Sequence, residues 1–440
     1  MYKPQWDTLV TTKEISSLDQ MAKDFLVVSD TYTGTLTDSY PYPMYRELRE
    51  NTPVKDGDIL AEYKVPSQAD YAMSGRPVMS VFKYDDVMSV FRDPLNWKSY
   101  INGDGFGAAV DNLMFTAMDG EEHKKFRKMF QPPFQLPVIR SMNESLIRPI
   151  IKNEFIDALK PNGKADLVRE FSLPFPVRVV YAIFGFPDDS EASMKFAGWA
   201  LRILGGPQVD PEVFKVTMPA AMEAGQQLFE HVLPIIQARR AEPEQRDDLI
   251  GFLLNVENDG VKFTDVEVAT FVRMLLLAAA ETTSRSFANM LVQLFDNPEV
   301  MEQVRNDRSL IPQTITETMR LEPVAAYLAR IADKDMELSG KKIPAGTAVS
   351  LCIAAANRDP SKYERPDELW IKRPMRPVLS FGFGAHTCMG MHIAKVEMEA
   401  ALDMLLDLPN LRLDPAYPRP EIRGMQLRGP DAVHVLWDTE

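Results

Sequence analysis

The chain has 440 residues, of which 45% are hydrophobic, and its formal net charge is -14. This composition supports a large buried core and argues against global disorder, and the acidic charge argues against a nucleic-acid partner, because it repels phosphate backbones. The two cysteines, Cys352 and Cys388, cannot form a disulfide framework, which favours a reducing, cytoplasmic location.

The first part of the chain is mixed in character. The N-terminus has no basic stretch followed by an apolar one, so we expect no secretory signal. A short helix is predicted after Pro41, and residues 78–82 alternate like a strand, within a β-rich part near 53–83. The longest apolar run, near residues 274–280, is far shorter than the roughly 20 residues that span a bilayer, which predicts no membrane span.

A long helix is predicted from Thr264 to Asp296, inside a helical core of about residues 120–325. Thr264 and Glu267 form a capping box, in which each side chain satisfies a backbone N–H at the start of the helix. The next helix begins at Asn297, with Pro298 at its first position. About 30 residues correspond to roughly 45 Å, so this helix must cross the whole core.

After Arg320 the pattern changes to short strands and irregular chain. Residues 327–332 and 347–353 read as strands within a β-rich part near 325–352, and a turn at Pro344 and Gly346 separates them. Residues 357–387 are irregular, and a helix is predicted over 389–408. We therefore expect a mainly α fold with small β-sheets: a single domain over residues 1–440, with a large helical part and a small β-rich part.

The segment 381–390 carries the chemistry, because glycines surround Cys388. Gly382 and Gly384 permit a positive φ before the cysteine, and Gly390 follows it. Cys388 comes just before a helix, whose partial positive charge favours a thiolate. A buried structural cysteine is one interpretation of such a loop, and a cysteine nucleophile with His386 as its base is another.

Read as a whole, the loop resembles the haem-binding signature of the cytochrome P-450 family. Its pattern is Phe-x-x-Gly-x-x-x-Cys-x-Gly, with histidine two residues before the cysteine, and the match continues to Glu397, with Lys395 where the family often has arginine. The resemblance implies the cytochrome P-450 fold and haem b (iron protoporphyrin IX), with Cys388 as the sulfur ligand of the iron. The implied haem contacts within the loop are Phe381, Gly382, His386, Cys388 and Gly390.

The same resemblance assigns structural and propionate-binding roles elsewhere. Glu317 and Arg320 share a helix face and match the family's Glu-x-x-Arg pair, which anchors the core around the cysteine loop. A second arginine completes that network, and Arg373 is favoured over Arg365. His123, Arg127, Arg330 and His386 match the residues that bind the haem propionates, and cationic donors around two carboxylates suit a buried site.

On the long helix, the resemblance identifies Glu281 and Thr282 as the catalytic acid–alcohol pair. The family uses this pair to steer protons to bound dioxygen above the iron, and Ala278 and Ala279 line the haem there. Ala279 departs from the glycine that is common in the family, and its methyl group narrows the groove.

The implied reaction is monooxygenation: dioxygen is the co-substrate, one oxygen atom enters a small apolar organic substrate, and the other leaves as water. No flavin, nicotinamide or iron–sulfur module is visible, so NAD(P)H acts only indirectly, through a ferredoxin and a ferredoxin reductase. Lys124, Lys125, Lys128 and Arg376 form either a dock for an acidic ferredoxin or an ordinary solvated face.

Positions in the family also predict an apolar substrate pocket. Its candidate residues are Met114, Phe115, Leu275, Val324, Ala325, Leu328 and Met425. A peroxide-dependent haem-thiolate peroxygenase and a non-catalytic haem- or ligand-binding protein remain alternatives, and Glu281 and Thr282 favour dioxygen activation over peroxide use.

Overall fold

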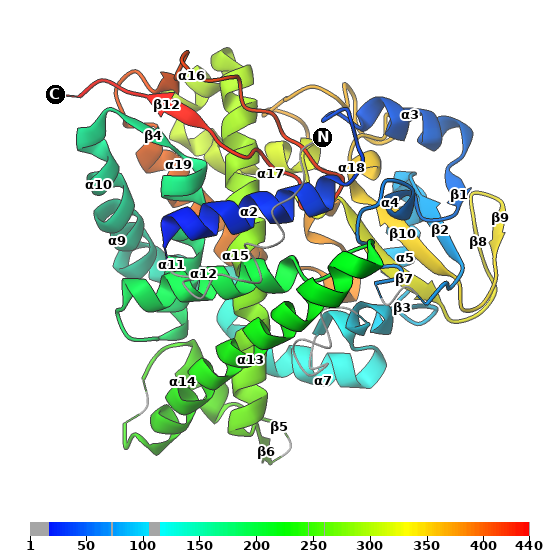
Figure 1. Ribbon diagram of the computed structural model, residues 1–440, viewed down its shortest axis with the longest axis horizontal. Helices are drawn as coiled ribbons and strands as arrows, with labels where there is room; N and C mark the ends of the chain where they lie inside the picture. The colour runs from blue at the N-terminus through cyan, green and yellow to red at the C-terminus, as the bar shows by residue number, and fades with distance from the viewer. Residues whose placement is uncertain (1–16, 72–73, 105–114, 245, 259, 440) are drawn as a thin grey trace.

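The computed structural model describes residues 17–71, 74–104, 115–244, 246–258 and 260–439. The fold is mainly helical, and its larger sheet lies at one side of the helical body, as Figure 1 shows. This is the expected fold class. The α-helices are α2 (Leu18–Thr33), α3 (Tyr42–Asn51), α4 (Ile59–Glu62), α5 (Tyr84–Arg92), α7 (Gly120–Phe130), α8 (Leu136–Met142), α9 (Arg148–Ile150), α10 (Asp157–Leu159), α11 (Pro174–Phe184), α12 (Ser190–Leu204), α13 (Pro211–Ala241), α14 (Leu249–Asn255), α15 (Asp265–Asp296), α16 (Pro298–Asn306), α17 (Ile311–Leu321), α18 (Ile353–Ala356) and α19 (Met391–Leu405).

The strands form small sheets. The largest has the order β1-β2-β10-β7-β3, in which β2 and β10 are parallel and the other pairs are antiparallel. The strands are β1 (Val54–Asp56), β2 (Val78–Val81), β3 (Trp97–Lys98), β4 (Lys164–Asp166), β5 (Glu257–Asn258), β6 (Val261–Lys262), β7 (Tyr327–Ala332), β8 (Met336–Leu338), β9 (Lys341–Ile343), β10 (Ala348–Cys352), β11 (Arg412–Leu413) and β12 (His434–Leu436).

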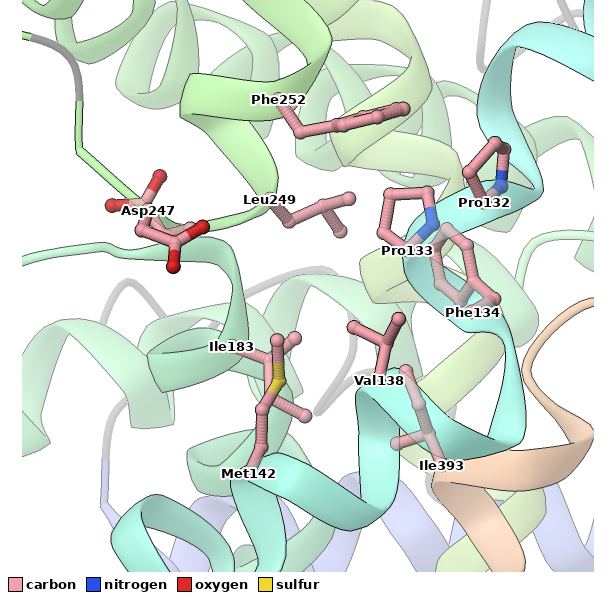
Figure 2. Close-up of a pocket in the computed structure, with 11 residues that line it drawn as sticks. Pro132, Pro133, Phe134, Val138, Met142, Ile183, Asp247, Leu249, Phe252 and Ile393 are labelled. Atoms are coloured by element: carbon pink, nitrogen blue, oxygen red, sulfur yellow. The ribbon is translucent and has the colours of Figure 1, made fainter.

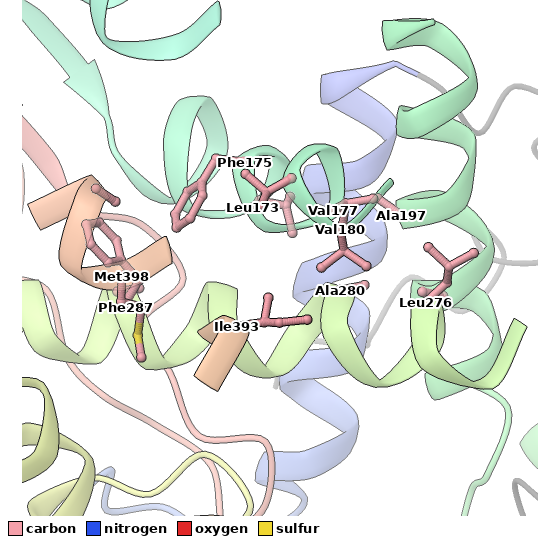
Figure 3. Close-up of a cluster of buried hydrophobic side chains, with 14 of the residues drawn as sticks. Leu173, Phe175, Val177, Val180, Ala197, Leu276, Ala280, Phe287, Ile393 and Met398 are labelled. Carbon is pink, nitrogen blue, oxygen red and sulfur yellow. The ribbon is translucent and has the colours of Figure 1, made fainter. Parts of the chain in front are cut away.

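Helix α15 is the axis of the helical body. It begins with the expected capping box: the Thr264 hydroxyl accepts from the Glu267 N–H at 3.2 Å, and the Glu267 carboxylate accepts from the Thr264 N–H at 2.8 Å. Its 32 residues reach about 48 Å. In the hydrophobic core, Figure 3 shows Ala280 and Phe287 of α15 beside side chains of α11 and α19, and Leu276 on the side of Ala197 in α12. The helix that carries the predicted acid–alcohol pair is therefore held by the helix that follows the cysteine loop.

Strand β7 presents two different faces. Side chains alternate along a strand, and Ala329 and Ile331 pack in a small apolar cluster with Ile101. Leu328 and Arg330 lie on the opposite face; Leu328 packs against the cluster that contains Leu379, and the Arg330 guanidinium lies 5.6 Å from the Phe91 ring. The pleat of β7 thus turns Leu328 and Arg330 toward the cysteine loop.

Helix α2 crosses α15 and lies beside α12 (Figure 1). The Tyr32 hydroxyl donates to the Leu204 carbonyl at 3.2 Å, and the Gln208 amide donates to the Thr31 hydroxyl at 3.2 Å. Helix α2 is not among the elements predicted from the sequence, although Ser17 caps it by accepting from the Gln20 N–H.

The helix after the cysteine loop is shorter than expected. It begins at Met391 because Gly390 is its N-cap, and the Cys388 N–H bonds back across the loop to the Phe381 carbonyl at 2.8 Å. It ends at Leu405 because the N–H groups of Asp407 and Leu408 bond three residues back, which is 3₁₀ geometry. Across the described parts of the chain, no helix combines the length and the apolar character needed to cross a membrane.

Candidate active site

The cysteine loop is a tight turn that requires two glycines. Gly382 and Gly384 have φ of 66° and 74°, where a side chain is strained. A Cβ on Gly384 would lie 2.5 Å from the Phe91 carbonyl oxygen of α5. The loop therefore rests directly on the backbone of α5, and this contact fixes where Cys388 emerges.

Cys388 opens into a cavity of about 600 Å³ whose lining includes His123, Arg127 and Gly384. The side chain is accessible from this cavity, yet the surrounding protein still raises the pKa of its thiol by desolvation. The N–H groups of Gly390 and Met391 and the charge of Arg127 lower that pKa. The net direction is upward, so the helix end alone does not produce the thiolate that the sequence predicted; coordination to a metal ion deprotonates a thiol outright.

The four predicted propionate-binding residues come together beside the cysteine. The rings of His123 and His386 stack with centroids 4.0 Å apart. Arg127 donates to the Thr387 carbonyl at 2.7 Å. Burial, followed by the charges of Arg330, His123 and Arg127, lowers the pKa of His386 to about 2, and burial lowers that of Arg330 to about 10.

Among the described residues, no carboxylate is ion-paired with the arginines of this basic cluster. Within the described ranges, neither Arg127 nor Arg330 forms an ion pair with a carboxylate, and the buried Nε2 of His123 has no hydrogen-bond partner. The nearby Asp119 carboxylate already accepts from the backbone N–H groups of Ser99 and Tyr100. Cations without counter-charges in a buried site are costly, and the two propionates of a bound haem would supply the missing charges. The donor set therefore fits haem.

A buried network of charged side chains contains the predicted pair of Glu317 and Arg320. Arg320 donates two bonds to Glu317, at 2.8 and 2.9 Å, and Arg373 donates to the same carboxylate at 2.9 Å. Arg365 instead pairs with Glu368 at the surface. Arg373 is thus the arginine that completes the network.

Helix α15 presents one open face near the middle of its length. Leu275, Ala278, Ala279 and Thr282, which share this face, are exposed or half-buried. The Thr282 hydroxyl donates to the Ala278 carbonyl at 2.8 Å. Glu281 points elsewhere: it is 1% exposed and accepts from Arg285 Nε at 2.5 Å. Burial raises the pKa of Glu281, and Arg285 opposes this shift.

The predicted pocket residues vary in accessibility. Leu275, Ala325 and Leu328 are half-buried, whereas Phe115, Val324 and Met425 are buried. Phe115 packs edge-on against Phe130 and Phe271. Met114 lies outside the described residues.

Sequence reasoning missed residues that contact the predicted acid. Arg285 and its partner Ser29, whose hydroxyl accepts from Arg285 Nη1 at 3.0 Å, were not singled out. The i, i+4 spacing of Glu281 and Arg285 was a usable signal, but Ser29 is 256 residues away in sequence and carried none.

A separate apolar cavity of about 210 Å³ lies among α8, α11, α14 and α19 (Figure 2). Phe134, Ile183 and Ile393 line it, and Asp247 stands near it in Figure 2. Its described lining includes none of the predicted site residues.

The family model described as Cytochrome P-450 matches residues 69–427. The cyclomarin C epoxidase CymV of Salinispora arenicola is 31% identical over 75% of this chain and 83% of its own length. The crystal structure of CYP109E1 from Bacillus megaterium in complex with corticosterone is 26% identical, with a TM-score of 0.76 over 90% of this chain and 98% of that one. CYP109B1 from Bacillus subtilis is 28% identical, with a TM-score of 0.76 over 90% of this chain and 99% of that chain.

Proposed function

Since this chain belongs to the cytochrome P-450 family and is a haem-thiolate monooxygenase, we propose that Cys388 is its iron ligand and that its substrate is a small apolar organic molecule. The observation that supports this most strongly is the position of Cys388, which opens into a cavity lined by His123 and Arg127. A cysteine nucleophile with His386 as its base is disfavoured, because burial and nearby cations keep the pKa of that imidazole far below neutrality.

The residues around Cys388 bind and orient the cofactor. His123, Arg127, Arg330 and His386 hold the propionates, which replace the missing counter-charges of this cluster. Gly390 leaves open space at the start of α19, since no described residue beyond its two chain neighbours has an atom within 4 Å of where its Cβ would be, and a flat macrocycle can approach the helix there. When bound, haem supplies the oxidising chemistry, and its thiolate ligand favours O–O bond cleavage.

Glu281 and Thr282 deliver protons to dioxygen, the proposed co-substrate. Thr282 lies on the open face of α15, and its hydroxyl is held by the Ala278 carbonyl. Glu281 is the buried carboxyl next to it, and burial raises its pKa, which favours the protonated form that an acid needs in order to donate. Ala279 on the same face is half-buried and narrows the groove slightly without closing it.

The substrate contacts the apolar side chains near this face. Leu275 of α15, Leu328 of β7 and Ala325 just before β7 are partly accessible, and such lining selects apolar ligands. The crystallised relative with corticosterone makes a steroid-sized molecule a reasonable first probe.

Electrons come from separate proteins, which we propose are a ferredoxin and its reductase, with NAD(P)H as the distant donor. Lys124, Lys125 and Lys128 are exposed on α7, and Lys124 and Lys128 line the cavity that contains Cys388. We name these lysines together with exposed Arg376 the basic dock. An acidic ferredoxin bound there lies close to the cofactor.

Residues 1–440 are proposed to form a single domain, in agreement with the uninterrupted family match over 69–427. A cytoplasmic location is proposed because Cys352 and Cys388 are both free thiols, as expected in a reducing compartment.

The absorption spectrum of the reduced, carbon-monoxide-bound protein tests the iron ligand. Thiolate ligation predicts a strongly red-shifted Soret band, and Cys388→Ala should abolish it. Cys352→Ala is the matched control, because this second cysteine is buried in β10 and should leave the band unchanged. A purified wild-type protein without haem, or a band typical of imidazole ligation, would contradict the proposal.

Turnover tests the reaction class. With ferredoxin, reductase and NADPH, we expect dioxygen uptake coupled to hydroxylated product. Product formed with hydrogen peroxide alone and not with the reductant system would identify a peroxygenase instead.

A further inference from the structure

The Arg285 side chain is enclosed by its own helix and by two segments that are distant in sequence. It belongs to α15 and is 1% exposed. From α2, the Ser29 hydroxyl accepts from its Nη1 at 3.0 Å, and the Phe25 ring lies with its centre 4.0 Å from the guanidinium carbon. From the C-terminal loop, Gly429 closes the third side, since a Cβ there would lie 3.2 to 3.4 Å from the Arg285 side chain.

The bond between Arg285 and Glu281 is incomplete. One bond joins Arg285 Nε to Glu281 Oε2, while the buried atoms Arg285 Nη2 and Glu281 Oε1 have no hydrogen-bond partner among the described residues. A buried ion pair contributes little stability even when it is fully bonded, and each unpaired buried polar atom adds a cost. Stability alone therefore does not account for the pair.

The bond between Arg285 and Glu281 also directs the Glu281 carboxylate away from Thr282. Glu281 is buried and reaches toward α2, whereas Thr282 is exposed on the open face of α15. Consecutive helical side chains point about 100° apart, so Glu281 does not share that face while it is bonded to Arg285.

We propose that Arg285 is the positioning residue of Glu281, and that helix α2, through Ser29 and Phe25, holds Arg285 in the place from which it bonds this acid. Arg285 thereby fixes the direction of the Glu281 carboxylate and favours its charged form. This inference rests on the proposed function, because it concerns the proton supply of that reaction.

Few other charges face the pair. Tyr32 of α2 interacts electrostatically with both Glu281 and Arg285, and it bonds to Tyr71. The aspartates of α2 are engaged elsewhere: Asp19 with Arg169, Asp24 with Gln20 and, at 3.9 Å, with Arg202 of α12, and Asp30 with Arg423 of the C-terminal loop. On α19, Glu397 bonds to Thr283. Arg285 is accordingly the cation whose removal should affect Glu281 most.

Infrared titration of the Glu281 carboxyl in the holoprotein tests the contact directly. The protonated C=O band of Glu281 is identified by its loss in Glu281→Gln. In Arg285→Gln, the pH at which this band disappears should rise by about 1 to 3 units, because the opposite charge is gone; Arg285→Lys should give a smaller rise. Arg273→Gln is the matched control, since Arg273 is also buried on α15 but donates to the Gly225 carbonyl and lies over Phe229, and it should leave the titration unchanged.

Ser29→Ala tests the part played by α2. The titration of Glu281 should move in the same direction by a smaller amount, and the share of NADPH electrons recovered in product should fall at neutral pH in both Ser29→Ala and Arg285→Gln. Arg285→Gln with a wild-type titration would overturn the inference, and so would Ser29→Ala with both wild-type titration and wild-type coupling. The infrared measurement needs no turnover. If the expected shifts are seen in a protein that forms no product, the proposed reaction is contradicted, but the contact between Arg285 and Glu281 is not.

Discussion

At the scale of single residues, buried charges determine how the site is held. Glu317 accepts from Arg320 and Arg373 in an interior where unpaired charge is costly. Arg365, eight residues before Arg373, pairs with Glu368 where both side chains are largely exposed, and exposed pairs contribute little. Two arginines close in sequence therefore have very different consequences for the fold.

Arg373→Gln is expected to destabilise the protein by about 3 to 5 kcal/mol, because Glu317 loses one of its buried partners. Arg365→Gln should cost about 0 to 1 kcal/mol. The midpoints of urea unfolding, followed together with haem release, measure both. Equal losses of stability in the two variants would show that Arg373 in the buried network contributes no more than Arg365 at the surface.

Asp24 makes the stability of the folded protein depend on pH, and the direction follows from its raised pKa. It is fully buried, and burial raises its pKa from 3.8 to about 6, against the opposing effects of Gln20 and Arg202. Between about pH 4 and 6 the folded state therefore holds a proton that the unfolded chain has lost, so this group makes the protein less stable as the pH rises.

Asp24→Asn should remove this pH dependence. The full effect corresponds to about 3 kcal/mol across the pH window, and unfolding midpoints of wild type and variant at pH 4 and pH 7 measure it. The advantage of the variant over wild type should grow from the lower to the higher pH; a constant difference would be inconsistent with a titrating Asp24.

At the scale of elements, α15 depends on both its start and its middle. Its first turn is stabilised by Thr264 and Glu267 through two reciprocal bonds. Its middle holds Thr282 on one face and Glu281 on another. Helices α11, α12, α13 and α19 all pack along it.

Thr264→Ala should lower the free energy of unfolding by about 1 kcal/mol, because the N-cap acceptor is lost. Thr264→Ser keeps the hydroxyl and should be close to wild type. Chemical unfolding measures both variants, and a serine variant as unstable as the alanine variant would argue against the capping box.

At the scale of the whole molecule, an acidic protein carries a local basic surface. The net charge is -14, yet two lysines of the proposed basic dock, Lys124 and Lys128, line the cavity that contains Cys388. Electrostatic complementarity acts mainly on the rate of encounter and on its salt dependence.

Charge reversal at Lys125 and Lys128 should slow reduction by ferredoxin about tenfold or more at low ionic strength, and should reduce its sensitivity to salt. Stopped-flow reduction kinetics measure this rate. The double variant Lys334→Glu and Lys342→Glu is the matched control, because it makes the same change of charge at exposed positions near the β8–β9 hairpin. If ferredoxin reduces both double variants equally fast, the basic dock is only a solvated face.

The sequence by itself determined the features that depend on neighbouring residues: the glycine-surrounded Cys388, the capping box of Thr264 and the i, i+4 pair of His123 and Arg127. Such signals are visible because spacing along a helix or turn reflects short-range geometry. Only the tertiary structure decided that Arg373 meets Glu317, that Glu281 turns toward Arg285, and that α2 encloses that arginine. The partners of Arg373 and of Ser29 lie 56 and 256 residues away in sequence, so these contacts depend on how the helices pack, which no local pattern encodes. Glu281 and Arg285 are only four residues apart, but burial of this pair against α2 is likewise a result of the packing.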